Sequence, residues 1–126
     1  MSPLKVYLAG PMRGYAAFNF PAFDFAAERL RAQGFEVFSP AERDRDVHGD
    51  AIEKNETGNE DEAASNVGFS LREALEADWV WIARNANIVA LMPGWEKSEG
   101  AQSEKQCARA LGLSVMELGK EYVRPK

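Results

Sequence analysis

The feature that constrains the fold most is a regular alternation of short apolar runs with amphipathic segments. Apolar, β-prone runs predict strands at 4–9, 35–39, 87–92 and 113–118. Apolar residues at helical spacing predict helices at 21–33, 70–84 and 100–111. This order is typical of an α/β domain, in which right-handed crossovers join parallel strands and helices cover both faces of the sheet.

Residues that begin or end helices support these boundaries. Pro21 suits the first turn of a helix, where its missing N–H costs little, and Asn19 is a plausible cap just before it. Ser70 and Glu73 have the spacing of a capping box. Gly112 follows the last expected helix, where a left-handed residue is favoured.

The stretch 41–66 has a different character from the rest of the chain. It is polar and acidic and contains no aromatic residue. We therefore expect a long, mobile loop there, within a single domain that spans residues 1–126.

Composition narrows the class of partner. The chain has 20 acidic against 15 basic residues and a net charge of -5, which argues against nucleic acid and anionic membrane surfaces. A single cysteine cannot form an internal disulfide, and no metal-ligand spacing of Cys and His is present. No segment reads as a signal peptide or a membrane span. We expect a cytoplasmic protein.

Two acidic residues interrupt helix faces that are otherwise apolar. Glu104 shares a stripe with Ala101, Ala108 and Leu111. Asp78 shares one with Leu71, Leu75 and Ile82. A carboxylate turned toward a core is costly unless it is paired, so two of them suggest a site with shifted pKa values. Cleavage of a glycosidic bond uses such a pair. The pattern alone leaves open that both acids are solvated at helix ends.

Two loops suggest a site for an anion. The first strand is followed by a glycine-containing loop that carries Arg13, whose guanidinium suits a phosphate. Ser98 lies just before the third expected helix, whose free N–H groups suit the same ligand. Neither loop matches a dinucleotide or P-loop fingerprint. Arg13 as a solvated residue and Ser98 as an ordinary helix cap remain alternatives.

Three motifs together resemble a known family. Residues 7–14 read YLAGPMRG, residues 18–21 read FNFP, and residues 93–104 fit the pattern PGW-x-x-S-x-G-A-x-x-E. The chain resembles the nucleoside 2-deoxyribosyltransferase superfamily, which is related to the nucleotide N-glycosidases, and within it a small group common in phages and bacteria. The resemblance implies a flavodoxin-like (Rossmann-like) three-layer sandwich with a parallel sheet of four to five strands.

The resemblance also assigns roles to residues. It implies that Glu104 is the nucleophile, that Asp78 assists proton transfer at the base, and that Tyr7 orients the nucleophile. Ser98 and Arg13 favour a 5′-monophosphate, although the acidic Glu96 and Glu99 beside Ser98 would repel it. The residues expected to contact substrate are Gly10, Pro11, Met12, Arg13, Gly14, Phe18, Asn19, Pro40, Gly94, Trp95, Ser98, Gly100 and Ala101.

The expected function is cleavage or transfer at the N-glycosidic bond of a nucleoside 5′-monophosphate or nucleoside, through a covalent glycosyl-glutamate and without metal or cofactor. Two alternatives remain: a non-catalytic nucleotide-binding or sequestering protein, and a hydrolase of NAD-like or signalling nucleotides. Trp79 and Trp81 lie on different faces of one expected helix, and an exposed aromatic there suggests a homodimer or higher homo-oligomer. The sequence leaves open the base, the sugar, and the choice between hydrolysis and transfer.

Overall fold

The computed structural model describes residues 2–49, 58–59 and 70–123. In these ranges four strands form one sheet in the order β2-β1-β3-β4, and every pairing is parallel. The strands are β1 (Lys5–Ala9), β2 (Glu36–Phe38), β3 (Ile88–Leu91) and β4 (Ser114–Glu117). The predicted α/β class, with a flavodoxin-like three-layer arrangement, is confirmed.

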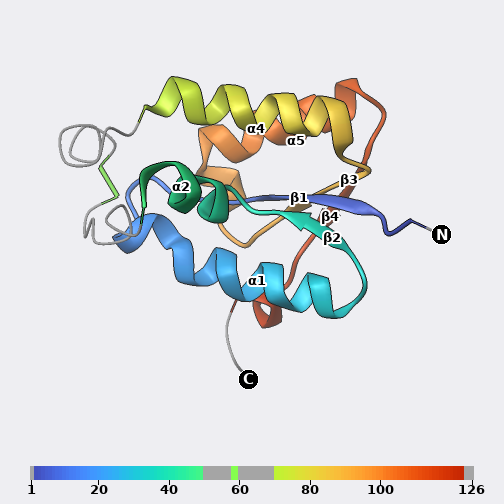
Figure 1. Ribbon diagram of the computed structural model, residues 1–126, viewed down its shortest axis with the longest axis horizontal. Helices are drawn as coiled ribbons and strands as arrows, with labels where there is room; N and C mark the ends of the chain where they lie inside the picture. The colour runs from blue at the N-terminus through green and yellow to red at the C-terminus, as the bar shows by residue number, and fades with distance from the viewer. Residues whose placement is uncertain (1, 50–57, 60–69, 124–126) are drawn as a thin grey trace.

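Helices cover both faces of this sheet. Figure 1 shows α1 (Phe20–Ala32) on one side, and α4 (Leu71–Asn85) and α5 (Glu99–Ala110) together on the other. All three lie within a few residues of the predicted ranges. Short 3-10 turns lie at Ala16–Asn19, Trp95–Lys97 and Lys120–Tyr122. None of the helices in the described ranges is both long and apolar enough to span a membrane.

Alternation along β1 divides the core into two layers. Val6 and Leu8 pack in the cluster that contains the inward face of α1, whereas Tyr7 and Ala9 pack in the cluster formed with α4 and α5. Successive side chains of a strand point to opposite faces, so the parity of position 7 decides where its side chain goes. Tyr7 is thereby directed toward α5 from the centre of the sheet.

The predicted loop over 41–66 is wrong at its beginning, where Pro40–His48 form helix α2. Pro40 lies in the first turn, and the face turned inward contains Ala41 and Asp44. Helical periodicity is hidden in the sequence because a buried acid stands where an apolar residue is expected. Residues 50–57 and 60–69 lie outside the described residues, so the remainder of that prediction is not addressed.

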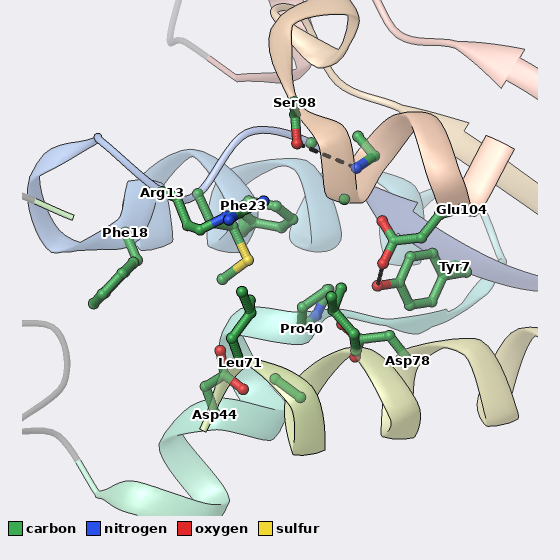
Figure 2. Close-up of a pocket in the computed structure, with 16 residues that line it drawn as sticks. Tyr7, Arg13, Phe18, Phe23, Pro40, Asp44, Leu71, Asp78, Ser98 and Glu104 are labelled. Carbon is green, nitrogen blue, oxygen red and sulfur yellow. Dashed lines mark hydrogen bonds between the residues drawn. The ribbon is translucent and has the colours of Figure 1, made fainter. Parts of the chain in front are cut away.

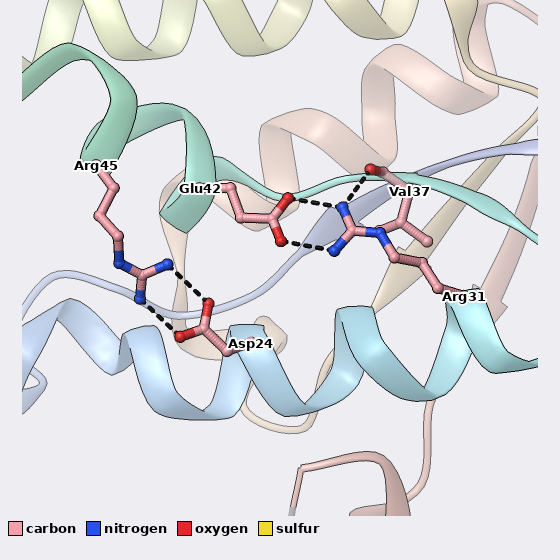
Figure 3. Close-up of polar contacts among 5 residues, drawn as sticks. All are labelled: Asp24, Arg31, Val37, Glu42 and Arg45. Carbon is pink, nitrogen blue, oxygen red and sulfur yellow. Dashed lines mark hydrogen bonds and ion pairs between the residues drawn. The ribbon is translucent and has the colours of Figure 1, made fainter.

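Ion pairs tie α2 to α1 (Figure 3). The guanidinium of Arg31 in α1 donates to both carboxylate oxygens of Glu42 at 2.6 Å and to the carbonyl of Val37 at 2.9 Å. Arg45 of α2 reaches the two oxygens of Asp24 in α1 at 3.1 and 2.6 Å. Two-pronged arginine–carboxylate pairs fix orientation as well as distance. They hold α2 in place where its few apolar residues would not.

The loops after β1 and β3 touch at Gly10. A Cβ added to Gly10 would lie 2.9 Å from both Cβ and Sδ of Met92. Contact this close forces the backbone to shift, because Cβ of Met92 cannot rotate away. Gly10 therefore allows the two loops that border the carboxyl ends of these strands to approach each other.

Gly10→Ala should lower the free energy of unfolding by about 1–3 kcal/mol, through overpacking against Met92. The matched control is Gly100→Ala in α5, where an added Cβ meets nothing closer than 3.8 Å. That change should be neutral or stabilise by up to about 1 kcal/mol, because alanine favours a helix. Chemical denaturation measures both. Equal stability of Gly10→Ala and the wild type would contradict the close approach of the loops.

Candidate active site

A cavity lies beyond the carboxyl ends of β1 and β3, where ligands of such sheets bind. β1 and β3 are the central neighbours in the order β2-β1-β3-β4, at the point where the chain switches from one side of the sheet to the other. The inner cavity encloses about 60 Å³. It shares Met12, Arg13 and Ser98 with an outer, more open hollow of about 280 Å³.

The structure brings most of the predicted residues to this inner cavity (Figure 2). Those that line it are Tyr7, Gly10, Met12, Arg13, Phe18, Pro40, Asp78, Ser98, Gly100, Ala101 and Glu104. Pro11 lines the outer hollow. Gly14, Asn19, Gly94 and Trp95 line neither.

Tyr7 and Glu104 form a buried hydrogen bond. The hydroxyl of Tyr7 donates to Oε2 of Glu104 at 2.5 Å, and the two residues are 0% and 5% exposed. Glu104 shares the inward face of α5 with Ala101 and Ala108, as its spacing predicts. Leu111, expected on the same stripe, instead ends the helix and is 50% exposed. The stripe therefore stops one turn early without moving Glu104 from its place.

Asp78 reaches the same cavity from α4. It is 6% exposed, and its Oδ1 has no hydrogen-bond partner among the described residues. The pKa of Asp78 is raised from 3.8 to about 7, mainly by burial and in smaller part by the charge of Asp44. The nearby Tyr7 hydroxyl lowers this pKa, even though it donates its single proton to Glu104. Asp78 is thus placed to hold a proton near neutral pH.

The carboxyl groups of Glu104 and Asp78 influence each other. Burial raises the pKa of Glu104 well above its usual value, and the charge of Asp78 raises it further. Two interacting buried acids lose their protons in separate steps, so the pair holds one negative charge over a range of pH. The hydrogen bond from Tyr7 opposes the rise in the pKa of Glu104. Burial and both carboxylates raise the pKa of Tyr7, which keeps it a proton donor.

The outer side of the site carries groups that suit an anion. Oγ of Ser98 accepts from the N–H of Ala101 at 3.1 Å, so it caps α5 while its own proton remains able to donate. Arg13 and Lys97 line the outer hollow beside it. Glu99 also lies there, with its carboxylate 3.9 Å from the Arg13 guanidinium. Positive charge and a helix N-terminus thus meet on the side away from α4.

An unusual backbone turn presents Phe18 to the cavity. Ala17, Phe18 and Asn19 all have left-handed φ angles, of 54°, 50° and 62°. Such angles cost non-glycine residues roughly 1–2 kcal/mol each. The side-chain amide of Asn19 donates to the carbonyl of Pro11 at 3.0 Å and helps to hold the turn. Asn19 therefore shapes the loop from outside the cavity.

Trp95 lies away from the cavity, on the other side of α5. Its indole N–H donates to Glu117 at 3.2 Å, and the ammonium of Lys105 lies 4.4 Å from the ring centroid. Trp95 and Phe18 were both among the residues expected to contact substrate. Only Phe18 is placed at the cavity.

The sequence did not predict that Asp44 belongs to the site. It lines the cavity from α2, together with Phe23, Leu71, Ala74 and Leu75. The only signal in the sequence was the nearby Pro40, which was expected to contact substrate, although the residues after it were expected to form a loop. No group of three or more His, Cys, Asp or Glu side chains in the described ranges is arranged to hold a metal ion.

Comparison with known families gives a clear membership. Residues 4–117 match a family described as a domain of unknown function (DUF4406). The chain belongs to this family. All residues that line the cavity fall inside the matched range, so the site is part of the DUF4406 domain. No curated protein and no solved structure matches the chain.

The raised pKa of Asp78 predicts a specific dependence of stability on pH. Between about pH 4 and about pH 7 the folded state holds a proton that the unfolded state releases, so the free energy of unfolding falls as pH rises through this window. Asp78→Asn removes that loss. At about pH 8 the variant should be more stable than the wild type by about 2–4 kcal/mol, with little difference at about pH 4.

Urea denaturation at both pH values measures this effect. Asp46→Asn in α2 is the matched control, because Asp46 is an exposed acid, and it should change stability little at either pH. An Asp78→Asn variant that is less stable than the wild type at about pH 8 would contradict the buried position of this carboxyl.

Proposed function

We propose that this protein cleaves, or transfers the sugar of, the N-glycosidic bond of a nucleoside 5′-monophosphate or nucleoside. The observation that supports it best is the Tyr7–Glu104 hydrogen bond in a buried cavity that also receives Asp78. Glu104 accepts a hydrogen bond from Tyr7, and Asp78 can hold a proton near neutral pH. Breaking a glycosidic bond requires these two roles together.

In the first step, a carboxylate oxygen of Glu104 forms a bond to the anomeric carbon. The bond between that carbon and the base nitrogen breaks, and its electron pair goes to the base. Asp78 gives its proton to the departing base, so the base leaves neutral. Positive charge develops on the sugar ring in the transition state, and the buried Glu104 anion stabilises it. Tyr7 keeps the carboxylate in position throughout.

In the second step, the glycosyl-glutamate is resolved. A water molecule, or the nitrogen of a second base, attacks the anomeric carbon and Glu104 leaves as a carboxylate. Asp78 accepts the proton that the attacking group loses, which restores the starting state. Hydrolysis and transfer thus share one intermediate and differ only in which nucleophile reaches it.

The outer hollow supports a 5′-phosphate on the substrate. Ser98 and Arg13 line both the inner cavity and the hollow, and Lys97 adds a second cation there. A phosphate at the N-terminus of α5 would receive N–H groups as well as the Ser98 hydroxyl. Glu99 opposes this, but its side chain is 91% exposed and its charge is therefore screened by solvent.

Substrate entry requires the inner cavity to widen. A volume of about 60 Å³ holds a few water molecules, whereas small-molecule sites typically measure about 300–1,000 Å³. Much of the lining is apolar side chain, including Met12, Leu71 and Leu75. Rotation of such side chains makes room without breaking hydrogen bonds. The base then displaces water from beside two acids, which strengthens their action on the bond.

One observation favours a non-catalytic nucleotide-binding protein instead. The pKa of Glu104 is raised well above its usual value, and a protonated carboxyl cannot attack carbon. Binding of ligand without release of base would support this second function. A hydrolase of NAD-like or signalling nucleotides would be recognised by a preference for such a nucleotide over nucleosides and monophosphates.

We expect the protein to release free base from at least one member of a panel of nucleosides, nucleoside 5′-monophosphates and NAD. Glu104→Gln should reduce the rate by at least about 1,000-fold, because the nucleophile is lost. Glu76→Gln is the matched control, since Glu76 is an exposed acid of α4, and it should leave the rate unchanged. Chromatography of the products measures both. Full activity of Glu104→Gln would exclude the proposed mechanism.

The same panel tests the place of the phosphate. Ser98→Ala should raise KM for monophosphates and leave KM for nucleosides unchanged, because the phosphate is the only part of the substrate that the hydroxyl is proposed to contact. Activity on nucleosides but not on monophosphates would contradict the roles given to Ser98 and Arg13.

A further inference from the structure

We propose that Asp44 reads the base and selects bases that carry an exocyclic amino group. This inference rests on the proposed function, because it assumes that a base enters the cavity. It concerns a residue of α2 that no sequence motif pointed to.

Asp44 is a buried acid held toward the cavity. It is 4% exposed and lines the cavity, and its Oδ1 accepts from the Arg43 guanidinium at 2.8 Å. Arg43 neutralises part of its charge, yet burial still raises the pKa of Asp44. A buried acid paired with its own chain neighbour costs stability and connects no distant parts of the fold. A ligand that donates hydrogen bonds to Asp44 would offset this cost.

Contacts outside the cavity fix the position of Asp44. Its sequence neighbours Glu42 and Arg45 form ion pairs with Arg31 and Asp24 of α1 (Figure 3). These pairs set both the place and the rotation of α2. Binding residues on elements held in this way discriminate better than those on loops, because they cannot follow a poorly fitting ligand.

The path of the ligand leads to Asp44. Figure 2 shows Ser98 and Asp44 on opposite sides of the cavity, with Glu104 and Asp78 along a third side. With the phosphate near Ser98 and the anomeric carbon at Glu104, the base extends past Asp78 into the remaining space. Asp44 and Asp78 line the same cavity from α2 and α4, two helices that contact each other. One base can therefore contact both.

A carboxylate offers only acceptors to a base edge. An amino group donates an N–H to it, whereas a carbonyl at the same ring position directs lone pairs at the carboxylate and leaves the lone pairs that Arg43 does not use without a donor. Cytosine and uracil differ in this way, as do adenine and hypoxanthine. One hydrogen bond to a charged group corresponds to roughly 10- to 100-fold discrimination, and the repulsive alternative widens the gap.

The test compares kcat/KM within two matched pairs, cytidine against uridine 5′-monophosphate and adenosine against inosine 5′-monophosphate. The wild type should prefer the amino member of at least one pair by about 10-fold or more. Asp44→Asn should bring that ratio to about one or below, because an amide can also donate to a carbonyl. Asp46→Asn, on the exposed side of α2, should leave the ratio unchanged.

The outcomes separate this inference from the proposed function. Base release at equal rates within both pairs, or an unchanged ratio in Asp44→Asn, overturns the inference and leaves the enzyme activity standing. If no nucleoside or nucleotide of the panel releases base, the proposed function fails, and calorimetric binding of free cytosine against uracil still tests Asp44. Equal or absent binding of the two bases then overturns it. If Asp44→Asn does not fold, the wild-type ratio decides alone.

Discussion

The hydrogen bond from Tyr7 to Glu104 joins the centre of the sheet to the helix that covers it. Apart from Asp78, the layer around it is built from apolar side chains, so each partner is costly without the other. The parity of β1 and the phase of α5 must both be correct for the two groups to meet. The two loops that touch at Gly10 and Met92, and the cap from Ser98, fix the ends of those same elements.

Several features around this bond lower the stability of the fold. Asp78 and Asp44 are buried in positions that apolar residues would fill more favourably, and both have raised pKa values. Three consecutive residues of the loop before α1 adopt left-handed angles, and the middle one, Phe18, lines the cavity. Such departures concentrate at ligand sites, because a stable scaffold elsewhere can compensate for them. Here the compensation comes from the apolar layers and from the ion pairs between α1 and α2 (Figure 3).

Much of this architecture can be predicted from the sequence, because the governing pattern is local. Strand and helix periods, the Ser70 cap and the glycine after α5 all act within a few residues, and they place Tyr7, Asp78 and Glu104 on the faces that the structure shows. Helix α2 could not be predicted from the sequence, because the contacts that stabilise it are not local. Its inward face is marked by Asp44, and its outward face is stabilised by partners in α1, more than ten residues earlier in the chain for Glu42. The position of Trp95 could not be predicted for the same reason, since its hydrogen-bond partner Glu117 lies in β4, far along the chain.

In the proposed function, Glu104 forms a covalent bond to the sugar. A nucleoside 5′-monophosphate with fluorine at the 2′ position slows release of the sugar and so accumulates the intermediate. Intact-mass spectrometry after incubation should show one added sugar phosphate per chain, and peptide mapping should place it on Glu104. Release of base with no adduct, or an adduct on another residue, would contradict the account.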